Sequence, residues 1–137
     1  MGMLHTILAG ACAGFAGVVI SATVTGWLFH RFQARTPGTW RPAEGPLQYT
    51  AASALTFVAA ASVVALFSLG GDRLLVGDSW LLRGTAFGMM CWAALIAPVL
   101  LSLALFVNWH RGFLVGLLID WLLVMTAAGA IAAYFAG

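Results

Sequence analysis

A single charged residue, Asp120, interrupts the stretch FLVGLLIDWLLVMTAAGAIAAYF at residues 113–135. A helix needs about 20 predominantly apolar residues to cross the hydrocarbon core of a bilayer. Three further stretches meet this requirement, at about residues 4–29, 48–70 and 80–107. The sequence therefore predicts an all-α, polytopic membrane protein in which residues 1–137 form a single transmembrane domain.

The composition excludes several other classes of protein. Hydrophobic residues make up 63% of the 137 residues and charged residues only 7%, whereas soluble domains carry about 25% charged residues. The net charge of +2 is too small for a nucleic-acid-binding surface, so we expect the lipid bilayer as partner and no nucleic acid. The apolar runs are continuous, which excludes a β-barrel built from alternating strands of about ten residues.

Short connections between the four stretches predict an up-down-up-down four-helix bundle. The first and third connections hold more basic residues than the opposite face does. The two sets are Arg31, Arg35, Arg41 and Arg111 against Arg73 and Arg83. Because basic residues favour the cytoplasmic side, we expect loops one and three in the cytoplasm and both termini outside. The absence of lysine and the short loops suit a bacterial inner (cytoplasmic) membrane.

Small residues recur at a spacing of four in three of the predicted helices. The pairs are Gly10 and Gly14, Gly84 and Gly88, and Gly112 and Gly116. Such rows allow helix backbones to approach closely in lipid, either within one chain or between two copies. Pro98 lies inside the third predicted helix, where we expect a kink or a local unwinding.

Asp120 is the strongest candidate for a functional residue. It lies about 10–12 Å from the start of its helix at 1.5 Å per residue, and a charged Asp at depth costs about 2.5–3.5 kcal/mol. It must therefore be neutral, paired with another group or reached by water. Hydroxyl residues expected at the same depth are Ser21, Thr25, Ser53, Thr56 and Ser102. This polar layer could be a proton or cation relay, a ligand anchor, or a packing contact of a protonated carboxyl.

A His-Arg dipeptide ends the first and the third predicted helix. The dipeptides are His30-Arg31 and His110-Arg111, and the bundle layout places both on the membrane face nearest Asp120. Two His and two Arg could bind an anionic lipid headgroup or a phosphate, and the His could pass protons to Asp120. The alternative is interfacial anchoring by snorkelling Arg and neighbouring aromatic residues.

The sequence contains no nucleophile–base pair, no Gly-rich phosphate loop and no carboxylate pair. We therefore expect no enzymatic activity, no metal and no cofactor. Thiol and thioether side chains, which suit Cu(I), occur at Cys12, Met89, Met90, Cys91 and Met125. Cys and Met are also ordinary core residues, and this is the interpretation that we favour.

Two segments carry a resemblance to a known family. The first is Gly26-Trp27-Leu28-Phe29 followed by Trp40, and the second runs from Phe113 through Asp120-Trp121 to Gly129-Ala130-Ile131. Together they resemble a family of small bacterial four-helix membrane proteins described as a domain of unknown function. The resemblance implies four helices and a role for Trp27 and Asp120, and it implies no activity.

Two functional hypotheses follow. The first is a non-enzymatic inner-membrane bundle that forms a homo-oligomer or serves as a subunit of a membrane complex. It rests on the small-residue rows and on the lack of any domain outside the lipid. The second is a small transporter or channel that uses Asp120 with His30 and His110 to move a proton-coupled or cationic solute.

Overall fold

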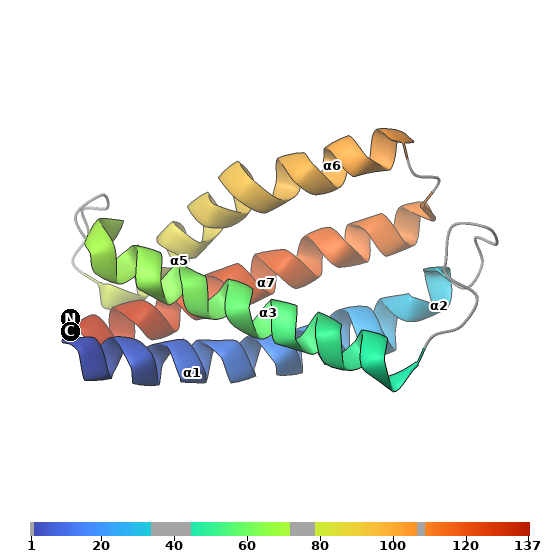
Figure 1. Cartoon of the computed structure of the whole chain (residues 1–137). Coiled ribbons are helices and arrows are strands. Elements are labelled where there is room, and N and C mark those ends of the chain that lie inside the picture. The colour runs from blue at the N-terminus through green and yellow to red at the C-terminus, as the bar shows by residue number, and fades with distance from the viewer. Residues whose placement is uncertain (1, 34–44, 72–78, 107–108) are drawn as a thin grey trace.

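The computed structural model describes residues 2–33, 45–71, 79–106 and 109–137, which form four long helices and no strand. The helices run alternately up and down, so that the two ends of the chain lie together at one end of the bundle (Figure 1). Each helix is long and apolar enough to cross a membrane. The predicted all-α four-helix membrane bundle is therefore confirmed.

Three of the four long helices change their winding along their length. The first comprises α1 (Met3–Ser21), the π-helical segment η1 (Ala22–Phe29) and α2 (His30–Gln33); the second, α3 (Pro46–Leu66) and π-helical η2 (Phe67–Gly71). The third comprises α5 (Trp80–Cys91), π-helical η3 (Trp92–Ile96) and α6 (Ala97–Phe106). The fourth is the uninterrupted α7 (Arg111–Ala136). The first helix thus extends beyond its predicted end at Phe29, and the second begins slightly before its predicted start.

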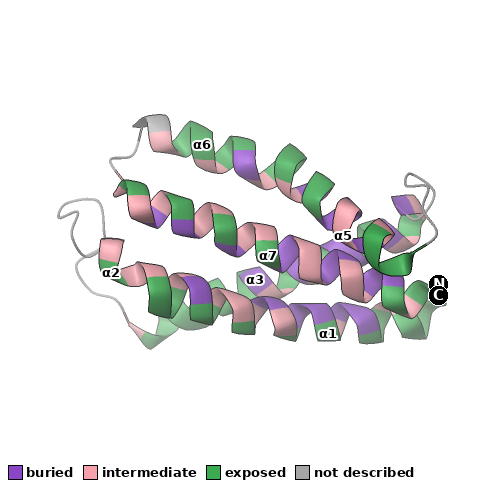
Figure 2. Cartoon of the chain, turned by 180° about the vertical axis from the view of Figure 1, so that it is seen from behind, coloured by how far each residue is buried: buried purple, intermediate pink, exposed green. Residues whose placement is uncertain are grey.

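The last helix, α7, lies at the centre of the bundle, where it contacts α1, α3 and α5. The core near the chain termini consists largely of small side chains, among them Ala9, Ala13, Ala60, Val64, Ala128 and Ala132. Because these side chains are short, the helices approach closely at this end, and buried residues gather there (Figure 2). At the opposite end α3 and α6 diverge from their neighbours (Figure 1).

Glycines bring the backbones of α5 and α7 into direct contact. Gly84 faces the carbonyl of Gly129, and Gly88 faces the carbonyl of Met125. A Cβ at either glycine would overlap the backbone of the facing helix. Contact of this kind maximises van der Waals packing, which drives helix association in lipid.

The other predicted packing glycines also contact helices of the same chain. Gly14 lies against the ring of Phe57, Gly112 against Phe32 and Gly116 against Phe29. Gly10 faces Ala61 at an ordinary packing distance. Of the two alternatives for the small-residue rows, packing within one chain is the one that these glycines adopt.

The third helix widens into a π-helical turn immediately before Pro98, as the predicted local unwinding requires. Within this turn the Ala97 N–H donates to the carbonyl of Trp92, five residues earlier. The wider turn accommodates a proline that cannot donate a backbone hydrogen bond. It also contains the indole of Trp92, whose Nε1–H donates to the Leu118 carbonyl of α7 at 3.0 Å.

Replacing Trp92 by Phe is expected to lower the free energy of unfolding by about 0.5–1.5 kcal/mol, the net contribution of one hydrogen bond. A phenyl ring is smaller than an indole, so the variant also loses some packing against the core, and the interhelical bond accounts for its difference from the control. Titration with dodecyl sulfate in mixed micelles measures this change. The matched control is Trp80→Phe, because Trp80 makes an edge-on ring contact with Tyr134 that a phenyl ring preserves. Equal losses in the two variants would contradict a role for the Trp92 bond.

Candidate functional site

The carboxyl group of Asp120 is buried in the bundle and held by two hydroxyl groups. Its side chain is 2% exposed. Ser21 donates to Oδ2 at 2.9 Å, and Thr25 donates to the same oxygen at 2.8 Å. The second oxygen, Oδ1, is buried and has no hydrogen-bond partner among the described residues. The structure thus brings together three of the residues predicted to share a polar layer.

The position of Ser21 and Thr25 follows from how the first helix packs on α7. Ser21 ends α1 and Thr25 lies in η1, so their hydroxyls are four residues apart on one side of the helix. One turn further on, the ring of Phe29 lies against Gly116 of α7, which has no side chain to hold the two helices apart. This contact sets both hydroxyls against Asp120, which follows Gly116 by four residues on α7.

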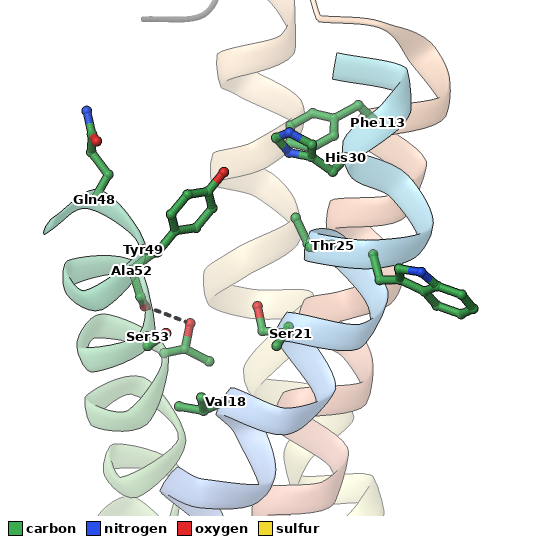
Figure 3. A pocket seen from close by; sticks show the side chains of 13 residues that line it. Val18, Ser21, Thr25, His30, Gln48, Tyr49, Ala52, Ser53 and Phe113 are labelled. Carbon is green, nitrogen blue, oxygen red and sulfur yellow. Dashed lines mark hydrogen bonds between the residues drawn. The ribbon is translucent and has the colours of Figure 1, made fainter. Parts of the chain in front are cut away.

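A cleft with a volume of about 750 Å³ lies between the first helix and α3, next to these hydroxyls. Ser21 and Thr25 line it from one side, and Ser53 and Thr56 line it from α3. Figure 3 shows the two helices facing each other across it. Asp120 does not line the cleft and lies behind the hydroxyls of Ser21 and Thr25. The buried carboxyl is therefore connected to an open space through two hydrogen-bonding side chains.

Aromatic and polar side chains line the cleft nearer the membrane face. Tyr49 extends from α3 towards His30 and Phe113 of the facing helices (Figure 3). Gln48 and Trp27 also line this part of the cleft. His30 is half-buried, so its imidazole lies between the exterior and the hydroxyl groups deeper in the cleft.

His110, by contrast, is not among the residues that line the cleft. Its Nδ1 accepts a hydrogen bond from the backbone N–H of Gly112 at 3.1 Å and thereby caps the start of α7. Its ring stacks on Phe32, with 5.3 Å between the ring centroids. The structure therefore places His30 in the cleft but not His110, and the predicted role of His110 as a proton carrier to Asp120 stays a prediction.

The two arginines of the His-Arg dipeptides are exposed at the same end of the bundle. The Arg31 guanidinium lies 5.2 Å from the centroid of the Phe32 ring, a distance typical of a cation–π contact. Arg111 begins α7. Their binding to anionic headgroups stays a prediction, as does the role of Trp40, which lies outside the described residues.

Of the other predicted members of the polar layer, Thr56 and Ser53 line the cleft, whereas Ser102 does not. Ser102 is exposed on α6, and both hydrogen bonds to Asp120 come from the first helix. The prediction for Ser102 is wrong because α6 diverges from α7 after the π-helical turn. Depth along a helix was predictable, but the side of α6 that faces outwards was not.

Sequence reasoning missed Gln48 and Tyr49 as lining residues of the cleft, although a signal was present. Tyr49, Ala52, Ser53 and Thr56 recur at the spacing of one helix face and are the most polar row of α3. A row of hydroxyl and small side chains on an apolar helix indicates a face turned away from lipid.

Comparison with known proteins finds no protein-family model that matches the chain and no significant match among curated proteins or solved structures. The resemblance to the bacterial four-helix family stays a prediction. Among the described residues, no group of three or more His, Cys, Asp or Glu side chains is placed to hold a metal ion.

Proposed function

We propose that the protein is a small membrane transport protein that exchanges protons for a cation, with Asp120 as the group that binds and releases the proton. The observation that carries this proposal is the connection of a buried carboxyl to an open cleft through Ser21 and Thr25. A carboxyl inside a membrane bundle is expensive, and such residues commonly mark proton or ion pathways.

The arrangement supports competition between a proton and a cation for one negative charge. Asp120 is the only acidic side chain among the described residues, and its described hydrogen bonds come from hydroxyl groups, not from a cation. A cation in the cleft would favour the ionised carboxylate, and loss of the cation would favour the protonated form. His30, at the outer part of the cleft, is the group best placed to relay the proton. No catalytic step is involved.

A self-associating bundle or complex subunit is the competing function. This hypothesis rests mainly on the small-residue rows. The glycines of these rows contact other helices of the same chain. No other described feature favours a second copy over a surrounding lipid. We therefore give preference to transport.

The location follows from the distribution of basic residues. We propose a multi-pass protein of a bacterial inner membrane with loops one and three in the cytoplasm, because Arg residues are more numerous there. The cleft then opens towards the cytoplasmic half of the bilayer.

The test is proton exchange in proteoliposomes that contain a pH-sensitive dye and an outward proton gradient. Sodium, potassium and benzylguanidinium chlorides are added outside in separate trials; benzylguanidinium stays charged and crosses lipid poorly. We expect at least one of these cations to accelerate proton exit through the wild-type protein. We expect Asp120→Asn to reduce the rate to that of empty liposomes, because the amide binds no proton.

The control variant is Ser62→Ala, which removes an exposed hydroxyl whose only described bond is to Val58 of its own helix. It should exchange protons at the wild-type rate. The proposal fails if Asp120→Asn exchanges protons as fast as the wild type, or if no cation in the panel moves protons faster than in empty liposomes.

A further inference from the structure

Three hydroxyl groups that line the deep part of the cleft, those of Ser21, Thr25 and Thr56, have a common polarity. Each hydroxyl has one hydrogen to donate and two lone pairs that accept. The hydrogens of Ser21 and Thr25 are used on Asp120. The hydrogen of Thr56 is used on the Ala52 carbonyl at 3.0 Å, the bond drawn as a dashed line in Figure 3. All three groups therefore offer the cleft acceptors and no donors.

The Asp120 carboxyl behind these hydroxyls, once ionised, also favours a cation over an anion. The Asp120 carboxyl lies against two of the three acceptors, and its Oδ1 has no hydrogen-bond partner among the described residues. No Arg is among the residues that line the cleft. In the deep part of the cleft an anion would meet lone pairs and, behind them, a carboxyl that is negative whenever its proton has left, which is costly in a medium of low dielectric. A cation that donates hydrogen bonds would satisfy both.

The size and walls of the cleft indicate the rest of the ligand. A volume of about 750 Å³ lies within the range of sites for small organic molecules and is far larger than a bare metal ion requires. Tyr49 and Phe113 provide aromatic surface along its outer part. Such walls bind an apolar or aromatic body next to a cationic head.

We infer that the cleft binds an organic cation with N–H donors, an ammonium or guanidinium group on an apolar body, with the N–H groups directed at Ser21, Thr25 and Thr56. This inference rests on the proposed transport function and names its substrate class. It predicts that the cleft distinguishes between cations by their number of N–H donors and not by their charge alone.

Isothermal titration calorimetry of the protein in lipid nanodiscs tests the inference with three probes of similar shape: benzylammonium, benzyltrimethylammonium and phenylacetate. We expect benzylammonium to bind about tenfold or more tightly than benzyltrimethylammonium, which lacks N–H donors, because hydrogen bonds to charged groups are the strong ones. Phenylacetate should not bind. The inference is overturned if the affinity for phenylacetate equals the affinity for benzylammonium. It is also overturned if benzylammonium and benzyltrimethylammonium bind with equal affinity.

The variant that isolates the acceptor is Thr56→Val, which keeps the shape of the side chain and leaves the Asp120 bonds intact. This variant should lower the affinity for benzylammonium several-fold. The weaker affinity for benzyltrimethylammonium should stay unchanged. The matched control is Thr50→Val on the same helix, whose hydroxyl makes the same kind of bond, to Pro46, but does not line the cleft. Equal effects of the two variants would count against an acceptor role for Thr56.

A primary ammonium can come from a dissolved amine or from an ethanolamine lipid, and the composition of the nanodisc separates the two sources. Weaker benzylammonium binding in discs that contain phosphatidylethanolamine than in phosphatidylcholine discs indicates a lipid ligand. Equal binding indicates a dissolved amine.

Failure of the inference is distinguishable from failure of the proposed function. Loss of all benzylammonium selectivity, with cation-driven proton exchange still dependent on Asp120, rejects the substrate class and keeps transport. Selective binding without any proton exchange rejects transport and keeps the ligand class.

Discussion

The double variant Gly84→Ala/Gly88→Ala is expected to lose about 2–6 kcal/mol of unfolding free energy, since overpacking a well-packed site costs about 1–3 kcal/mol. Both added methyl groups would overlap backbone atoms of α7, which cannot rotate away as a side chain could. The third helix must therefore move off α7 or unfold. Dodecyl sulfate titration followed by tryptophan fluorescence measures the loss.

The matched control is Gly10→Ala/Gly26→Ala, which adds the same two methyl groups to the first helix. At Gly10 a Cβ would lie 3.7 Å from Ala61, an ordinary packing distance. At Gly26 the nearest atom is 4.0 Å away. We expect this control to retain wild-type stability. A control variant as unstable as Gly84→Ala/Gly88→Ala would show that glycine itself, and not the contact with α7, is required.

Removing both hydroxyl groups that hold Asp120 is expected to lower the free energy of unfolding by about 1–3 kcal/mol, the cost of leaving a buried polar group unsatisfied. The variant is Ser21→Ala/Thr25→Val. Its carboxyl group then has no described hydrogen bond to either oxygen. The same titration measures the loss.

The triple variant Ser21→Ala/Thr25→Val/Asp120→Leu should recover most of this stability, because Leu has the branching shape of Asp and needs no partner. Removing both partners of a buried hydrogen bond is often nearly neutral. The control Thr23→Val/Ser62→Ala removes two exposed hydroxyls that bond only to carbonyls of their own helices. If the triple variant is no more stable than the double variant, the hydroxyls stabilise the bundle by some means other than satisfying Asp120.

Much of the candidate site was predictable because depth in a membrane helix is proportional to residue number. Short connections fix the direction of each helix, so Ser21, Thr25 and Thr56 could be placed at the level of Asp120 from counting alone. Counting does not give the side of a helix that faces its neighbours. Ser102 was misplaced for this reason, because α6 turns outwards after η3. The contacts of His110 with Gly112 and Phe32 are likewise not given by counting.

By itself, the sequence determined the four apolar helices, their alternating direction and the presence of one carboxyl inside the bundle. These properties depend on the length and hydropathy of each segment, because the bilayer imposes a fixed thickness and satisfied backbone groups on any spanning chain. Only the tertiary structure decided which faces meet. Small residues close the bundle near the termini, and aromatic residues such as Phe29 and Phe113 occupy the other end, where α3 diverges and the cleft opens. Which faces pack together depends on how side chains of two different helices fit each other. The sequence of one helix alone does not give this fit.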